Sequence, residues 1–205
     1  MKKIIIYQVL PRLFGNLNQN RIENGTLAEN GVGKFSSFSP EILHRIHSLG
    51  ATYVWYTGII RHATATSYSS IGIPPQHPEI VKGKAGSPYA ITDYYDVDPD
   101  LADCPQKRME EWEELIQRTH QSGMNVIMDF VPNHVAREYH SIKRPSNIAD
   151  LGQDDNKGMH FAPYNNFYYC PGEHLDLSAV LSEEQQNKST YDEFPAKCTG
   201  NDRFD

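Results

Sequence analysis

The sequence predicts an α/β fold built on a parallel sheet, because three runs of apolar or β-branched residues alternate with two segments of helical periodicity. Strands are expected at residues 4–9, 51–57 and 125–131, and helices at residues 39–49 and 106–122. The turns from helix to strand are tight, at Gly50 and Gly123, whereas the connections from strand to helix are long. This asymmetry is typical of a (β/α) barrel in which loops at the carboxyl ends of the strands build a site.

The two helices are predicted from their ends and their apolar spacing. Ser39 and Pro40 fit the N-cap and the first helical position of the first helix. The apolar residues recur at helical spacing: Ile42, Leu43, Ile46 and Leu49 in the first helix, and Met109, Trp112, Leu115 and Ile116 in the second. His44 and His47 lie three residues apart, which indicates a solvated helix face rather than a metal site.

Two long segments lack such periodicity. Residues 58–105 carry scattered Gly, Pro, Ser and Tyr and are expected to form one long loop, a feature that in compact domains is usually functional. Residues 135–205 are rich in Asn, Asp, Tyr and Pro, with one short helix expected at residues 182–188. We therefore expect residues 1–134 to be barrel and residues 135–205 to be a loop-rich subdomain inserted after the third strand.

The composition excludes some partners. The chain of 205 residues has a net charge of −7 and no cluster of Lys and Arg, so we expect no nucleic-acid partner. No apolar stretch approaches the roughly 20 residues of a membrane span, so no membrane partner is expected either. The N-terminal MKKIII imitates a signal peptide, but Pro11 and Arg12 follow soon after and no cleavage site is evident, which predicts a cytoplasmic protein.

The three cysteines, Cys104, Cys170 and Cys198, cannot all pair within one chain and show no CxxC spacing. This favours a reducing compartment and argues against a zinc site. A disulfide between Cys170 and Cys198 is an alternative that the sequence leaves open.

The segment DFVPNH carries the polar residues of most interest. Val126, Ile127, Met128 and Phe130 surround Asp129, which predicts a strand buried on both faces with a carboxylate inside it. Such a carboxylate needs hydrogen bonds or a cation, so Asp129 is interpreted either as a structural anchor or as part of a site. Pro132 ends the strand, which leaves Asn133 and His134 at its carboxyl end, where ligands bind in parallel α/β proteins.

Three stretches together resemble the α-amylase family of glycoside hydrolases. They are IIIYQVLPRLF (residues 4–14), GSPYAITDYYDVDP (residues 86–99) and DFVPNH (residues 129–134), in the order and spacing of the family's first three strands. The resemblance covers residues 4–140. It implies a (β/α)8 TIM barrel, of which the first three strands and two helices are present here, with a domain inserted after strand three.

The resemblance also implies roles for individual residues. Tyr89 matches the aromatic residue that stacks on the sugar at the cleavage subsite, and aromatic rings suit the C–H faces of sugars. His134 matches the histidine that hydrogen-bonds a hydroxyl of that sugar, and Asp129 matches the carboxylate that holds the surrounding network. Asn133 matches a position that ligates a structural calcium in many members, and its amide oxygen suits that cation. Gly86-Ser87-Pro88 departs from the family, because an acidic residue that some relatives place three positions before the tyrosine is absent.

The resemblance therefore predicts a retaining enzyme that hydrolyses or transfers α-glucosidic bonds of starch, another α-glucan or a maltooligosaccharide. Retention needs two carboxyl groups about 5–5.5 Å apart, which the family supplies after strands four and five. The motif GxRxD is not found, and TGNDRFD, with Arg203 and Asp205, has a different spacing and no preceding strand. We expect this sequence to be the N-terminal part of a barrel that is inactive alone.

Two alternatives remain open. The first is a carbohydrate-binding or scaffold protein that keeps the fold without the catalytic carboxylates. The second is an unrelated parallel α/β binding domain, in which the Asn133-His134 pair only caps a strand and Tyr89 contacts no sugar.

Overall fold

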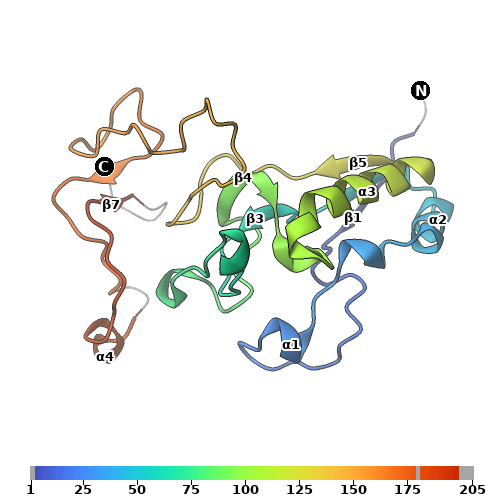
Figure 1. The fold of residues 1–205 in the computed structure, drawn as a ribbon, viewed down its shortest axis with the longest axis horizontal. Helices are drawn as coiled ribbons and strands as arrows, with labels where there is room; N and C mark the ends of the chain where they lie inside the picture. The colour runs from blue at the N-terminus through green and yellow to red at the C-terminus, as the bar shows by residue number, and fades with distance from the viewer. Residues whose placement is uncertain (1–2, 179–180, 199–205) are drawn as a thin grey trace. The chain divides into compact units, whose positions relative to one another are not determined.

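The structure is a computed structural model that describes residues 3–178 and 181–198. It divides into two compact units, Met1–Lys143 and Arg144–Asp205. Figure 1 labels most of the elements. The strands of the first unit are β1 (Ile6–Val9), β2 (Tyr53–Tyr56), β3 (Ile60–His62), β4 (Ile91–Val97) and β5 (Asn125–Met128). Its α-helices are α1 (Leu27–Asn30), α2 (Pro40–Ser48) and α3 (Arg108–Gln121). The second unit contains β6 (Tyr169–Cys170), α4 (Glu183–Gln186) and β7 (Ala196–Lys197).

The main sheet has the strand order β1-β2-β5 and all of its pairs are parallel, which confirms the predicted β-α-β-α-β arrangement. The register aligns Val9, Tyr56 and Met128, so the three strands end at the same level. The residues that follow each strand are therefore brought to one edge of the sheet.

Both predicted helices form for the reasons that the sequence offers. The Oγ of Ser39 accepts a hydrogen bond from the Ile42 N–H at 3.4 Å, and Pro40 begins α2. Gly50 follows the helix with a φ of +90°, a conformation that glycine adopts without steric cost. Helix α3 packs against α2 and β5 and buries Trp112 and Leu115.

The core of the first unit is centred on Tyr56. Its ring meets Phe38 and Trp112 edge to face, with centroids 5.1 and 5.5 Å apart. Its hydroxyl lies 2.7 Å from the Oγ1 of Thr119 on α3, which donates to the Leu115 carbonyl at 2.8 Å. Burial raises the pKa of Tyr56 to about 12, so the hydroxyl stays protonated and joins β2 to α3.

Two expectations about the strands are wrong. The third strand ends at Met128 rather than at residue 131, and it is exposed at both ends and half-buried between them. In the described part of the chain it pairs only with β2, so one edge lacks a neighbour. Asp129 therefore follows the strand and does not lie inside a buried one.

The prediction that residues 58–105 form one long loop is wrong. These residues contain the antiparallel pair β3 and β4, whose register shifts twice between Ile60 and His62. The segment after β5 also runs along β4, because the N–H groups of Ala136 and His140 donate to the carbonyls of Ile91 and Thr92 at 2.8 and 3.0 Å. Strand β4 thus supports the segment that carries Asn133 and His134.

The second unit contains one small antiparallel pair, β6 with β7. Asp155 organises it by accepting hydrogen bonds from the N–H groups of Asn166 and Phe167 and from the Tyr169 hydroxyl, at 2.8, 3.0 and 3.0 Å. The predicted short helix is confirmed as α4, with Ser182 as its N-cap. The Sγ atoms of Cys170 and Cys198 are 3.7 Å apart, beyond the roughly 2.05 Å of a disulfide.

The domain boundary expected at residue 134 stays a prediction. The structure itself divides into two compact units after Lys143. Arg203 and Asp205 lie outside the described residues. None of the helices that the structure describes is both long and apolar enough to cross a membrane.

Candidate functional site at the carboxyl edge of the sheet

The carboxyl ends of the three parallel strands are joined by hydrogen bonds in which side chains take part. The Nε2 of Gln8, on β1, donates to the Oγ1 of Thr57 at 3.0 Å. The N–H of Gly58 donates to the Oδ1 of Asp129 at 3.0 Å. The half-buried carboxylate of Asp129 therefore has a backbone partner, and it ties the end of β5 to the loop after β2.

Gly58 also connects Asp129 to the segment that carries Tyr89. A Cβ built on Gly58 would lie 2.8 Å from the Cβ of Pro88, closer than real Cβ atoms approach, and the φ of Gly58 is +73°. Only glycine allows both the backbone conformation and the close contact at this position. The side chain of Tyr89, the next residue, is partly exposed, at 39%. The ring is thus accessible beside the sheet edge.

Asn133 and His134 are both exposed, and the Nδ1 of His134 lies 3.0 Å from the Oδ1 of Asn133. Because that amide oxygen can only accept, the contact favours the tautomer with hydrogen on Nδ1. The Nε2 atom is left to meet a ligand. Among the described residues no hydrogen bond joins the side chain of His134 to Asp129 or Tyr89, so the structure brings Asp129 near the Tyr89 segment but does not link His134 to either.

Tyr94, on β4, is a positioning residue that the sequence interpretation missed. Its hydroxyl lies 2.6 Å from the Val131 carbonyl and 3.2 Å from the His134 carbonyl. Its ring packs against Phe130 and Tyr139, with centroids 5.1 and 5.8 Å apart. Burial raises the pKa of Tyr94, so its hydroxyl remains a donor at neutral pH. The β-branched and aromatic residues of ITDYYDV were the signal for this strand.

Strands β3 and β4 and helix α3 carry a network of buried charged side chains. Arg108 binds the carboxylate of Asp96 with two hydrogen bonds, of 2.7 and 2.8 Å. Arg61 lies 3.1 Å from Asp93 and 3.5 Å from Asp96. Asp93 also accepts from the Ser141 hydroxyl at 2.6 Å. These charges are almost fully buried and are paired on several sides, as buried charges must be.

A second charged cluster surrounds Arg12, which lies three residues after β1. Arg12 lies 2.9 Å from Asp100 and 3.6 Å from Asp98. The Nδ1 of His62 lies 3.3 Å from Asp98, and the Tyr68 hydroxyl donates to Asp100 at 3.0 Å. Burial raises the pKa of Asp98, an effect that His62 and Arg12 oppose. The same cause raises the pKa of Tyr68.

Calcium binding by Asn133 stays a prediction. The described residues contain no group of three or more His, Cys, Asp or Glu that could hold a metal ion. The Oδ1 of Asn133 is already in contact with His134. We therefore assign no step to a metal.

Polar side chains at the carboxyl edge of a parallel sheet, with helices returning behind it, define an α/β protein of the kind that binds ligands at that edge. The sequence model of the α-amylase catalytic domain matches residues 8–193, and the chain belongs to that family.

Individual relatives are similar over most of the chain. An α-glucosidase of Pediococcus pentosaceus is 26% identical over 143 residues, which cover 70% of this chain and 19% of that protein. Maltase 1 of Drosophila virilis is 26% identical over 151 residues, which cover 74% and 18%. The chain thus spans about a fifth of the length of the curated relatives that it matches.

Among solved structures, the chain is similar to an α-amylase from Lactobacillus plantarum. It is 26% identical, with a TM-score of 0.45, over 68% of this chain and 24% of that one. A maltogenic α-amylase from Thermotoga neapolitana is 28% identical, with a TM-score of 0.44, over 68% and 25%.

Proposed function

We propose that this chain forms the first three strands and two helices of a (β/α)8 barrel in an α-glucan-acting retaining glycoside hydrolase or transglycosylase. Membership of the α-amylase family supports the reaction class. The observation that carries the proposal is the hydrogen bond from Gly58 to Asp129, because it fixes the loop after β2 at the edge where barrel enzymes bind substrate.

Each residue of the site has a role that follows from its chemistry. The exposed ring of Tyr89 packs on the C–H face of a glucosyl unit. The Nε2 of His134 meets a hydroxyl of the same unit, since Nδ1 is held by Asn133. Asp129 does not contact the sugar itself. It holds the Gly58 amide, and Gly58 packs against Pro88, the residue before Tyr89. These residues bind and orient the sugar.

Cleavage needs chemistry that these residues do not supply. A retaining glycosidase uses a carboxylate nucleophile and a carboxylic acid about 5–5.5 Å apart. The GxRxD motif does not occur in the 205 residues. The neighbouring carboxylates Asp93 with Asp96 and Asp98 with Asp100 are buried and paired with arginines. We therefore propose that the 205-residue chain binds α-glucan without cleaving it.

Calorimetric titration with maltotriose, together with an assay of reducing-sugar release from starch, tests this proposal. We expect saturable binding, loss of most affinity in Tyr89→Ala and no sugar release. Tyr95→Ala is the matched control, because Tyr95, on strand β4, is exposed to a similar extent, at 45% against 39% for Tyr89. Equal affinities of the two variants would refute the role of Tyr89, and sugar release would refute the absence of catalytic carboxylates. A carbohydrate-binding relative without enzymatic activity would give the same binding but no activity in any form of the protein.

A further inference from the structure

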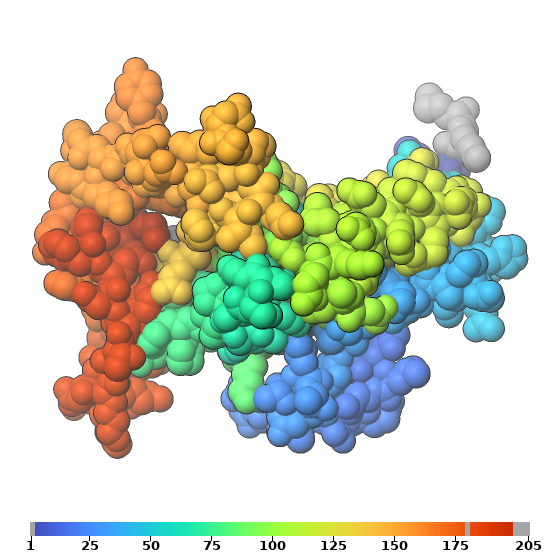
Figure 2. Space-filling model, viewed as in Figure 1, coloured from blue at the N-terminus to red at the C-terminus, as the bar shows by residue number. Residues whose placement is uncertain are grey.

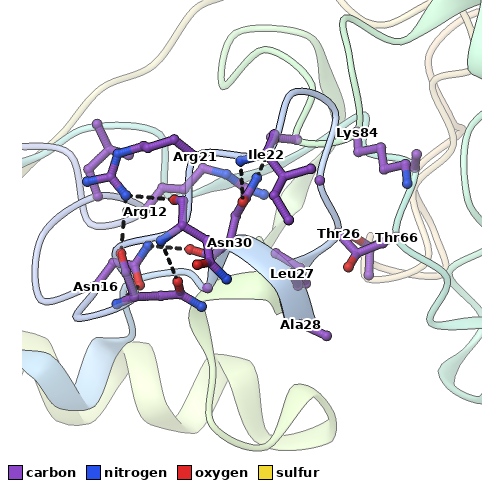
Figure 3. A pocket seen from close by; sticks show the side chains of 17 residues that line it. Arg12, Asn16, Arg21, Ile22, Thr26, Leu27, Ala28, Asn30, Thr66 and Lys84 are labelled. Carbon is purple, nitrogen blue, oxygen red and sulfur yellow. Dashed lines mark hydrogen bonds between the residues drawn. The ribbon is translucent and has the colours of Figure 1, made fainter.

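A cavity lies in the first unit, beside the segment that connects β1 to α2. Its volume is about 750 Å³, within the usual range for small-molecule pockets of roughly 300–1,000 Å³. Residues from 12 to 31 form most of the lining, and Ala65, Thr66, Lys84 and Ala85 close the other side. Figure 2 shows the first of these segments in blue on one face of the unit. Figure 3 shows the cavity from close by.

The asparagines of the lining are occupied in holding the loop. The Oδ1 atoms of Asn16 and Asn18 accept from the backbone N–H two residues on, at 3.1 and 2.8 Å. Asn20 donates to the Glu29 carbonyl at 2.7 Å. Asn30 makes two hydrogen bonds to the backbone of Ile22, of 3.0 and 2.8 Å. These amides therefore build the wall, and a ligand has to be recognised mainly by other groups.

The charged groups of the lining are all positive. Arg12, Arg21 and Lys84 line the cavity, and no Asp or Glu is among its described lining residues. The all-positive lining contrasts with the net charge of the chain, which is −7. The cavity therefore favours an anion.

Two of the three cationic side chains in the lining have hydrogen-bond partners among the described residues, and Lys84 is fixed only through its backbone. The backbone of Lys84 is fixed because the Ala65 N–H donates to its carbonyl at 2.9 Å. Arg21 donates to the carbonyls of Asn18 and Asn20 at 3.2 and 2.7 Å, and Arg12 is bound by Asp100 at 2.9 Å. Arg12 is thus partly neutralised. Figure 3 shows Lys84 near Thr26 and Thr66, away from Arg12.

Lys84 and Arg21 form no ion pair with any residue that the structure describes. Glu29, an acidic residue of this loop, accepts from the N–H and the hydroxyl of Thr26 at 2.7 and 2.8 Å, and its charge also interacts with that of Lys84. Neither Lys84 nor Arg21 therefore has a salt-bridge partner among the described residues. A ligand that carries an anionic group can neutralise them.

We propose that this cavity binds the anionic group of a phosphorylated or carboxylated saccharide. The saccharide part rests on the proposed function, because Lys84 lies five residues before Tyr89 and Arg12 three residues after β1, so the cavity adjoins segments that lead to the sugar site. The apolar side chains of Leu13, Ile22 and Leu27 supply surface for a sugar ring. The charged group is recognised by Lys84 and Arg21.

Calorimetric titration of the 205-residue protein with glucose 6-phosphate, glucuronate, glucose and inorganic phosphate tests this inference. We expect glucose 6-phosphate, glucuronate or both to bind at least about tenfold more tightly than glucose, and Lys84→Gln to weaken that binding about tenfold. Lys82→Gln is the matched control, because Lys82 is an exposed lysine two residues away that does not line the cavity. Binding of only one of the two anionic sugars identifies the group as phosphate or carboxylate.

Three results would overturn the inference. They are equal affinity for glucose and both anionic sugars, equal effects of Lys84→Gln and Lys82→Gln, and affinity for inorganic phosphate that matches the affinity for glucose 6-phosphate. A titration of the same protein with maltotriose tests the proposed function separately. Failure of one can therefore be told from failure of the other.

Discussion

The backbone N–H of Gly58 donates to the Oδ1 of Asp129 at 3.0 Å, which joins the loop after β2 to the end of β5. The two residues are 71 positions apart in the sequence. Both strands end at the same level of the sheet, so a single side chain can fix the geometry of a loop that the sequence alone leaves undetermined.

Removal of this carboxylate tests that role. We expect Asp129→Ala to lower the free energy of unfolding by about 1–3 kcal/mol, because the Gly58 N–H loses its partner, and to weaken maltotriose binding. Asp129→Asn keeps an oxygen acceptor and should restore most of both losses. Thermal unfolding and calorimetry measure the two effects. If Asp129→Asn is as damaging as Asp129→Ala, the negative charge matters rather than the hydrogen bond.

Gly58 provides a test of the close contact with Pro88. We expect Gly58→Ala to destabilise the protein more than Gly72→Ala, as measured by urea denaturation. Both glycines have similar positive φ values, +73° and +79°, so the backbone cost of about 1–2 kcal/mol is shared. Only Gly58 has a side chain close to its Cβ position, since nothing lies within 4 Å of that position at Gly72. Equal losses of stability would contradict this packing.

Tyr94 is expected to hold the segment that carries His134. Tyr94→Phe removes the hydroxyl that lies 2.6 Å from the Val131 carbonyl, and it should cost about 1 kcal/mol of stability. Amide hydrogen exchange at residues 130–134 should become faster, because the segment loses its anchor to β4. Tyr95→Phe is the control on the exposed side of the same strand. Unchanged exchange in Tyr94→Phe would exclude the anchoring role.

The buried carboxyl of Asp98 predicts a pH dependence of stability. Because burial raises the pKa of Asp98 in the folded state, its protonated form is favoured by folding. The stabilisation is complete below the pKa of the unfolded chain, about 3.9, and it is lost as the pH rises through the raised folded pKa.

Asp98→Asn should therefore gain stability relative to the unmodified protein as the pH rises above about 4. Urea denaturation across that range measures the difference. Asp103→Asn is the control, because Asp103 is exposed. A difference that shrinks as the pH rises would show that the neighbouring cations Arg12 and His62 outweigh burial.

Local chemistry predicted the parts of the fold that depend on neighbours in sequence. Ser39 and Pro40 defined the start of α2, and Ser182 that of α4, because capping involves residues only a few positions apart. Asn133 and His134 follow the carboxyl end of β5, as the order of residues along the chain indicates, although the strand ends at Met128, before Pro132.

Features that depend on distant pairing were not predictable in this way. The sequence does not predict strand β4, because its partner, β3, has only three residues and an irregular register. The exposure of β5 depends on which strands flank it, and no local pattern reports that. The partner of Asp129 is a backbone amide 71 residues away, and the anchoring by Tyr94 requires a strand that was missed.

The most direct test of the account is a titration with maltotriose followed by the ring-proton resonances of the tyrosines. Tyr89→Phe and Tyr95→Phe assign the two sets of signals. The account predicts that the Tyr89 resonances shift and saturate with maltotriose, because the ring stacks on the sugar, while those of Tyr95 stay in place. Binding that shifts neither residue, or both equally, would contradict a sugar site at the carboxyl edge of this sheet.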